Sequence, residues 1–299
     1  MDDTGVPGAE PFFADRAAQK RNFERAATSF TRGDALHREV AGRMLERFDV
    51  IKLAPRRILD LGSGPGAASA GLRNRFGAAG IVGLDLALAM ARAGMPRAPG
   101  WRRWLDRAPA ARAVCADMAA LPFAPGAFGL IWSNLALHWL DDPLPAIREA
   151  QRVLEVDGLF MFSMLGPDTL KELRAAFADA GPGWHVKRFI DLHDIGDALG
   201  AAGFGAPVMD MEILTLTYAD LDGLFADLRA SGSANAMTGR RRTLTGRARM
   251  QRVRSAYEMA RRDGRLPATF EVIYGHAWKA APRSRRSAEA VISFTPRRK

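Results

Sequence analysis

A glycine-rich turn that directly follows a short apolar segment carries the clearest chemical signal in the sequence. Gly62, Gly64 and Gly66 stand at alternate positions directly after residues 57–61, which read as a short buried strand, and Ser63 lies between the first two glycines. Glycine lets the chain turn sharply and lets a ligand approach the backbone closely. The helix predicted behind the turn would direct its free N–H groups at that ligand. The turn therefore predicts a binding loop for a nucleotide-containing cofactor.

Three acidic residues stand at the ends of three successive predicted strands. Asp60 precedes the glycines, Asp85 ends the second strand, and Asp117 follows the third. An acid at the second of these places can bind both hydroxyls of a ribose. A single acid there would more often be a helix cap or part of a solvated turn, but three at neighbouring strand ends predict one shared ligand site.

The spacing of the glycines distinguishes between two kinds of cofactor. A dinucleotide fingerprint reads G-x-G-x-x-G and has an acid about 20 residues further on, which Asp85 would satisfy. Here the glycines are spaced G-x-G-x-G behind an acid, and this order is similar to the first motif of class I methyltransferases. The similarity implies S-adenosylmethionine as the cofactor.

In that superfamily the acid before the glycines contacts the methionine part of the cofactor. The acid behind the third strand accepts a hydrogen bond from the adenine amino group, and the next residue holds the ring. The cofactor-binding residues implied in this sequence are Asp60, Gly62, Ser63, Gly64, Gly66, Asp85, Leu86, Asp117, Met118 and Ser133.

Short apolar segments alternate with helical patterns along most of the chain. This alternation predicts a Rossmann-like α/β fold, in which a mostly parallel seven-stranded sheet has helices on both faces. In such a sheet the carboxyl ends of the strands share one edge, where ligands bind. The strands are expected at residues 57–61, 81–85, 113–116, 128–133, 159–164, 208–218 and 270–278.

The rhythm of strands and helices also predicts the domain organisation. Residues 219–267 read as a helical cap inserted between the last two strands. One methyltransferase-like domain is expected over residues 21–282, with a loose arm at 1–20 and a basic disordered tail at 283–299. Thr169 and Glu172 are spaced as a capping box for a helix that follows the fifth strand.

Composition narrows the class of protein without identifying a partner. Hydrophobic residues make up 48% and charged residues 25%, which predicts a packed core. The net charge of +10 favours an acidic partner, which could be nucleic acid, an anionic membrane or an acidic carrier protein. No apolar run approaches the roughly 18 residues of a membrane span, and no signal-peptide core is present, so a cytoplasmic protein is predicted.

The metal-ligand and thiol side chains predict no metal site. The single cysteine, Cys115, excludes an intramolecular disulfide and reads as a small buried residue of the third strand. The five histidines are scattered without the regular spacing of metal ligands.

Several segments together resemble the malonyl-[acyl-carrier protein] O-methyltransferase family of biotin synthesis. The resemblance extends over about residues 20 to 280. The motifs that carry it are Asp117–Phe123, Leu135–Trp139, Gly166–Arg174, Arg240–Arg247 and Pro267–Lys279.

The resemblance implies methyl transfer from S-adenosylmethionine to the free carboxylate of malonyl-[acyl-carrier protein], giving the methyl ester that starts pimeloyl and biotin synthesis. A carboxylate is already ionised at pH 7, so the chemistry requires no general base. Alignment of the reacting atoms and exclusion of water would then carry catalysis. The implied partner is the malonyl-loaded carrier protein, with no nucleic acid or membrane; the oligomeric state is left open.

Two groups of residues are candidates for binding the substrate. Arg240, Arg241 and Arg242 on the predicted cap could meet the substrate carboxylate or the carrier protein, because a guanidinium pairs bidentately with carboxylates. The family usually has a tyrosine where this chain has Phe30, which offers no hydroxyl. His138 is expected to line the pocket rather than to transfer a proton. The acceptor-pocket candidates are Phe30, Ser133, Asn134, His138 and Trp139.

Three alternatives share this fold. One is an enzyme that methylates another small carboxylate, and another is a protein resembling an arginine-hydroxylating assembly factor. The third is a binding module that keeps the cofactor pocket without catalysis. The glycine motif and Asp85 do not separate these, but the ending Tyr274–Trp278 favours the carrier-protein methyltransferase.

Overall fold

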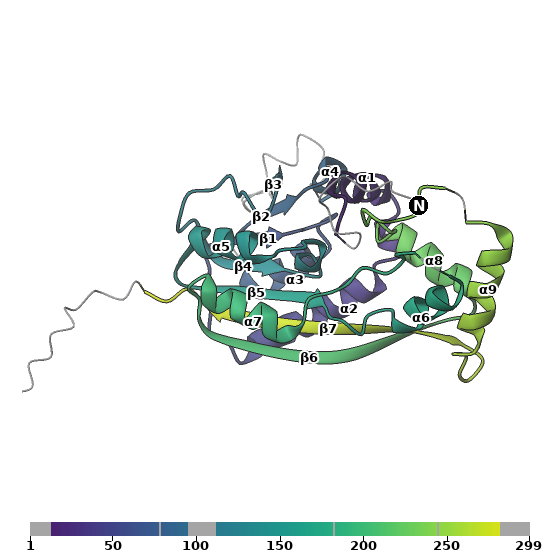
Figure 1. Cartoon of the computed structure of the whole chain (residues 1–299). Coiled ribbons are helices and arrows are strands. Elements are labelled where there is room, and N and C mark those ends of the chain that lie inside the picture. Colours follow the sequence, from purple (N-terminus) through teal and green to yellow (C-terminus); the bar gives the residue numbers. More distant parts are fainter. Residues whose placement is uncertain (1–12, 78, 95–111, 182, 244, 282–299) are drawn as a thin grey trace, which may run out of the picture.

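A seven-stranded sheet forms the centre of the computed structural model, which describes residues 13–77, 79–94, 112–181, 183–243 and 245–281 (Figure 1). The strand order is β3-β2-β1-β4-β5-β7-β6, and β7 alone runs antiparallel to its neighbours. This confirms the predicted Rossmann-like, mostly parallel sheet. The strands are β1 (Arg57–Leu61), β2 (Gly80–Asp85), β3 (Arg112–Cys115), β4 (Phe128–Ser133), β5 (Leu154–Leu165), β6 (Gly205–Tyr218) and β7 (Leu266–Trp278).

Helices cover both faces of the sheet because the central strands are apolar on both sides. Leu130 and Trp132 of β4 pack in one core cluster, while Ile131 between them packs in the other. The first cluster includes α2 and α3, and the second includes α5 and α7. The helices are α1 (Arg16–Ala26), α2 (Ala35–Glu46), α3 (Ala68–Phe76), α4 (Leu88–Ala93), α5 (Leu144–Val153), α6 (Lys171–Asp179), α7 (Leu192–Ala201), α8 (Leu221–Ala230) and α9 (Arg247–Glu258).

The carboxyl ends of the parallel strands meet at one edge, as predicted. In the register of the sheet, Leu61 of β1 pairs with Leu84 of β2, and Ser133 of β4 pairs with Phe162 of β5. The connection from β6 to β7 leaves from this same edge and contains α8 and α9. This confirms a helical insertion between the last two strands, which lies at the right of the view in Figure 1.

The amino-terminal segment differs from the loose arm expected at residues 1–20. Helix α1 begins at Arg16, and the Asp15 carboxylate caps it by accepting the Ala18 N–H at 2.9 Å. Ala14 forms a β-bridge with Met237, which lies beyond α8. Contacts with the inserted helical region therefore order residues that look structureless in sequence. The remainder of the arm and the tail expected at 283–299 lie outside the described residues.

The predicted capping box is wrong. The residue before α6 is Leu170, which has a left-handed backbone (φ 54°) and makes no side-chain cap. Glu172 turns to Thr269 of β7 and accepts its backbone N–H at 3.1 Å and its hydroxyl. Long-range pairing with the neighbouring strand thus displaces the local motif.

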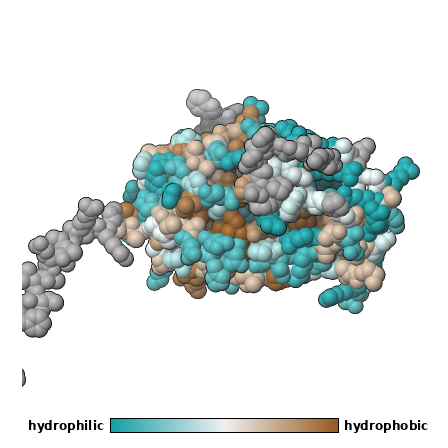
Figure 2. Space-filling view, viewed as in Figure 1, coloured by the Kyte–Doolittle hydropathy of each residue, from teal (hydrophilic) through white to brown (hydrophobic). Residues whose placement is uncertain are grey.

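The expected burial of the cysteine is also wrong. Cys115 is exposed, because β3 is the edge strand of the sheet and only β2 pairs with it. On the face seen in Figure 2, hydrophilic residues predominate and hydrophobic ones gather near the middle of the view. Among the described residues, no helix is both long enough and apolar enough to cross a membrane.

A pair of glycine substitutions tests the packing of β7 on β5. A Cβ atom at Gly275 would lie 2.2 Å from Phe162 Cζ, and at Gly196 in α7 it would meet nothing within 4 Å. We expect Gly275→Ala to lower the free energy of unfolding by about 1–3 kcal/mol through overpacking. Gly196→Ala should raise it by about 0.5–1 kcal/mol, because alanine favours the helix. Denaturant titration of both variants measures the difference, and equal effects would contradict the observed packing.

Candidate active site

A cavity of about 100 Å³ lies at the carboxyl ends of β1, β2 and β4. Residues from α1 and from the loops that follow β3 and β4 in the sequence complete its wall. The structure therefore brings together most of the residues that the sequence assigns to the cofactor. The predicted cofactor residues that line the cavity are Asp60, Gly62, Ser63, Gly64, Asp85, Leu86, Asp117 and Met118.

Two residues of the predicted cofactor set line neither this cavity nor the larger one described below. Ser133 is fully buried, and its hydroxyl donates to the Leu61 carbonyl at 3.0 Å, which ties β4 to β1. The Gly66 N–H donates to the Ser63 carbonyl at 2.9 Å and closes the turn. Both residues shape the loop instead of facing its cavity.

The glycine loop leaves open space where side chains would block it. Gly62 has φ 76°, and a Cβ atom there would lie 2.3 Å from Ala136 Cβ. Gly64 has φ 52°, and its Cβ would meet only Phe30 Cζ at 3.9 Å. Residues other than glycine adopt positive φ values of this kind only rarely. A ligand can therefore approach the loop backbone at Gly64, as a nucleoside cofactor requires.

The Asp85 carboxylate fixes this loop to the end of β2. One oxygen accepts the Gly64 N–H at 2.9 Å, and the other accepts the Ala87 N–H at 2.8 Å. Burial raises the pKa of Asp85, although the backbone hydrogen bonds act against that rise. Each carboxylate oxygen keeps lone-pair capacity for a further donor, such as a ribose hydroxyl.

The Asp60 carboxyl is buried at the wall of the cavity without a full set of partners. Only 2% of the residue is exposed, and Oδ2 has no hydrogen-bond donor. Burial, with a further contribution from the charge of Asp85, raises the pKa of Asp60 to about 7. A buried acceptor of this kind fits a ligand that brings a cationic or hydrogen-donating group.

The Asp117 carboxylate is paired within the protein. It accepts a hydrogen bond from the Arg16 guanidinium at 2.7 Å and another from the Ala119 N–H at 2.9 Å. Arg16, Gln19 and Phe23 of α1 line the cavity, and the sequence analysis missed all three. The signal available was Asp15, a helix-capping residue that stands before a helical run within the expected arm.

A second cavity of about 370 Å³ adjoins the first and has mostly apolar walls. It lies between α6, α8 and the segment 185–189. His37, Leu135 and Trp139 line both cavities, so these side chains form their junction. Of the predicted acceptor-pocket residues, His138 and Trp139 line the second cavity, whereas Phe30 and Asn134 line the first.

The His138 imidazole is neutral in this environment. Its Nδ1 accepts the Leu165 N–H at 3.4 Å, so the ring proton resides on Nε2. Burial lowers the pKa of His138 well below the usual range, and the nearby Lys187 charge lowers it further. The ring is therefore a hydrogen-bond donor at pH 7.

Comparison with known proteins places this geometry in a family. Residues 59–162 match the methyltransferase domain family. The chain is 49% identical to the malonyl-[acyl-carrier protein] O-methyltransferase of Laribacter hongkongensis, covering 96% of this chain and 98% of the relative. It is 41% identical to the protein of that name from Legionella pneumophila, covering 87% and 90%.

The chain belongs to the malonyl-[acyl-carrier protein] O-methyltransferase family. It is a methyltransferase, and its cofactor is S-adenosylmethionine. Among solved structures, the YcgJ protein from Bacillus subtilis shares the fold, with a TM-score of 0.56 and 17% identity over 81% of this chain and 99% of that one. A putative methyltransferase from Bacillus halodurans has a TM-score of 0.55 and 15% identity over the same shares of the two chains.

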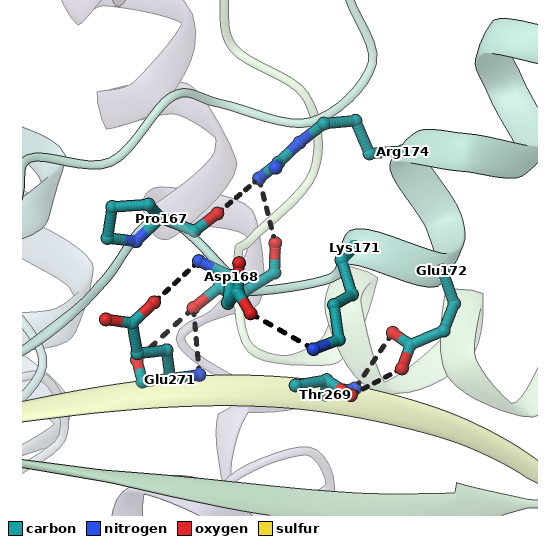
Figure 3. Close-up of polar contacts among 8 residues, drawn as sticks. Pro167, Asp168, Lys171, Glu172, Arg174, Thr269 and Glu271 are labelled. Atoms are coloured by element: carbon teal, nitrogen blue, oxygen red, sulfur yellow. Dashed lines mark hydrogen bonds and ion pairs between the residues drawn. The ribbon is translucent and has the colours of Figure 1, made fainter.

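The Gly166–Leu170 motif of this methyltransferase forms a clamp against β7 (Figure 3). The Glu271 carboxylate accepts the Asp168 N–H at 2.6 Å. The Thr169 hydroxyl contacts the Glu271 backbone, and the Leu170 N–H donates to the Thr269 carbonyl at 2.6 Å. Thr169 and Leu170 line the second cavity, so the motif builds part of that cavity's wall.

Arg240 lines neither cavity, although it is bonded to Met237, which lines the second. Its guanidinium bonds Asp15 at 2.9 Å and the Met237 carbonyl at 2.7 Å, which fastens the inserted region to the start of α1. The Arg240 guanidinium is thus hydrogen-bonded within the protein, and its predicted role in binding the substrate stays a prediction. Arg241 and Arg242 are exposed and line neither cavity, so they remain candidates for a protein partner.

Replacement of the buried acid gives a test of the cofactor cavity. The pKa of Asp60 is about 7 in the folded chain against an ordinary value of 3.8. The folded state therefore retains a proton that the unfolded chain releases, and stability falls as the pH rises from about 4 to about 7.

We expect Asp60→Asn to remove this loss and raise the free energy of unfolding at pH 8 by on the order of 1–3 kcal/mol, with little change below pH 4. Affinity for S-adenosylmethionine should fall roughly tenfold with the loss of the charged acceptor. Denaturant titration at several pH values and calorimetric titration measure both effects. Equal gains at pH 4 and pH 8 would contradict the raised pKa.

Proposed function

We propose that this protein transfers a methyl group from S-adenosylmethionine to the free carboxylate of a malonyl group carried by an acyl-carrier protein. The observation that carries the proposal is the pair of adjoining cavities. One has buried acids around a glycine loop, and the other is larger and mostly apolar. The names of the relatives support malonyl-carrier protein as the acceptor.

The proposed chemistry needs little from the protein beyond alignment and exclusion of water. When bound, S-adenosylmethionine supplies a methyl group on a positively charged sulfur, and an acceptor carboxylate takes it while the carbon–sulfur bond breaks and its electron pair stays on sulfur. The carboxylate is already ionised at pH 7, so no side chain has to remove a proton. Residues at the junction hold the acceptor at the cofactor and limit the entry of water.

The second cavity suits an acyl group attached to a thioester arm. Its walls include Leu165, Leu173, Phe177 and Phe225. Apolar walls accept an uncharged chain and leave a terminal carboxylate to seek the polar residues at the junction. A free malonate would carry a second charge into this apolar space, so the cavity favours the carrier-bound form.

Exposed arginines offer a surface for an acidic carrier protein. Arg229 of α8 is exposed and also lines the second cavity. Arg241 and Arg242 are exposed on the loop before α9. With the net charge of +10, they would attract an acidic partner towards the cavity that receives its acyl group.

Incubation with methyl-labelled cofactor and malonyl-carrier protein tests the activity. We expect label to appear on the carrier as an alkali-labile ester, because the methyl group joins a carboxylate. Free malonate, acetyl-carrier protein and unloaded carrier serve as parallel acceptors. Label on free small acids but not on the malonyl carrier would overturn the proposal in favour of another carboxyl methyltransferase.

Charge reversal tests the carrier surface. We expect the double substitution Arg241→Glu and Arg242→Glu to lower kcat/KM for malonyl-carrier protein roughly tenfold and to reduce its dependence on salt. The rate with a short malonyl-pantetheine thioester, which lacks the carrier, should stay unchanged. Lys52→Glu with Arg56→Glu reverses two exposed charges near the start of β1, at the opposite edge of the sheet, and is the matched control. Equal losses in both double variants would remove the assignment.

A further inference from the structure

In the part of the chain that the structure describes, no unpaired cation lies at the junction of the two cavities to meet the acceptor carboxylate. Among the described residues that line the cavities, Arg16 is paired with Asp117. Lys187 donates to Asp141 at 3.0 Å and to the carbonyls of Trp139 and Leu140 at 3.2 Å. Arg229 is exposed on α8 and lines only the second of the two cavities. The three residues shared by both cavities include one titratable group, His37.

His37 is held at this junction by its backbone. It lies in the first turn of α2, and its carbonyl accepts the Asn134 side-chain N–H at 2.9 Å. The side-chain oxygen Oδ1 of Asn134 accepts a hydrogen bond from the Ser163 hydroxyl at 2.9 Å. The His37 ring lies 4.9 Å from the Phe30 ring in an edge contact. The ends of β4 and β5 therefore fix where this imidazole stands.

The imidazole of His37 has an unused donor. Its Nδ1 atom is buried and has no hydrogen-bond partner. Its Nε2 atom is not buried, and no described residue forms a hydrogen bond with it. Burial lowers the pKa of His37 to about 4, so the ring carries one proton at pH 7. An enclosed N–H without an acceptor is more costly than an enclosed lone pair. The proton therefore belongs on Nε2, the nitrogen left open to a ligand.

His138, which lines the second cavity, also carries its ring proton on Nε2. The Leu165 N–H occupies its Nδ1, which leaves the proton on Nε2. No partner within the described residues accepts that proton, and Nε2 is not enclosed. Two neutral imidazoles thus offer N–H groups at and beside the junction of the cavities.

We propose that His37 and His138 together receive the acceptor carboxylate, each donating a hydrogen bond from Nε2. This assignment rests on the proposed function and names the groups that orient its substrate. Trp139 lines both cavities, as His37 and Leu135 do. Its ring lies against that of His138, with the ring centroids 5.3 Å apart, and limits the space around the ligand.

Neutral donors suit this reaction better than a guanidinium does. The carboxylate is negative before the transfer and the sulfur positive, and both charges diminish as the methyl group moves. A strong cation would stabilise the starting carboxylate more than the transition state and so slow the reaction. Two N–H donors orient the oxygen without that cost. The ester product accepts hydrogen bonds more weakly than the carboxylate, which favours its release.

The test measures discrimination between acid and ester. Binding of malonyl-carrier protein and of its methyl ester is titrated in the presence of S-adenosylhomocysteine, so that no transfer occurs. We expect the wild type to prefer the acid by roughly 10- to 100-fold, as for hydrogen bonds to a charged group. His37→Leu and His138→Leu should each reduce this preference at least several-fold.

Matched variants separate hydrogen bonding from packing. His37→Gln places an amide N–H near the position of Nε2 and should retain most of the preference, whereas His37→Asn places its amide near Nδ1 and should lose it. His193→Leu removes an exposed histidine of α7 that lines neither cavity and is the control. Affinity for S-adenosylhomocysteine and thermal unfolding establish that each variant folds. If His37→Leu does not fold, His37→Asn takes its place in the test.

The outcomes are distinct. Reduced preference in both leucine variants, with retention in His37→Gln, supports the assignment. Wild-type preference in either leucine variant overturns it while the proposed function stands. Failure of the wild type to methylate malonyl-carrier protein overturns the proposed function and this assignment with it.

Discussion

The hydrogen bonds that the Asp85 carboxylate accepts from Gly64 and Ala87 are the contact on which the active site depends. They hold a loop with three glycines in left-handed conformations against the end of β2. Together with the two backbone hydrogen bonds that the Leu84 carbonyl accepts from the loop, they fix the turn that precedes α3 to the sheet. The cost of burying that charge is offset by the two backbone donors, which also order the wall of the cofactor cavity.

Burial acts in opposite directions on the acids and the histidines of the site. It raises the pKa of Asp60 to about 7 and lowers that of His37 to about 4, because in each case the charged form is poorly solvated. Near neutral pH, Asp60 can respond to a cationic ligand, while the imidazole stays a neutral donor. Under the proposed function, Asp60 in the first cavity would then face a sulfonium cofactor, and His37 at the junction a carboxylate.

The site is assembled from segments far apart in the sequence. The pair of Asp15 and Arg240 joins residues separated by 225 positions, and the pair of Arg16 and Asp117 spans 101. The first pair joins the insertion between β6 and β7 to the start of α1, and the second joins α1 to the loop that follows β3. The Asp15–Arg240 pair therefore fastens the inserted region to the start of α1, and the second cavity lies between α6, α8 and the segment 185–189.

The sequence by itself determined the sheet, the glycine loop and the acids at its strand ends, because periodicity and glycine spacing act over a few neighbouring residues. It also indicated the family through motifs such as Leu137–Trp139. Tertiary structure alone decided the partners of Arg240, Glu172 and Arg16, and the exposure of Cys115 on an edge strand. It also decided which imidazole nitrogens remain open. Side-chain pairing and burial depend on which distant segments pack together, and no local pattern specifies that.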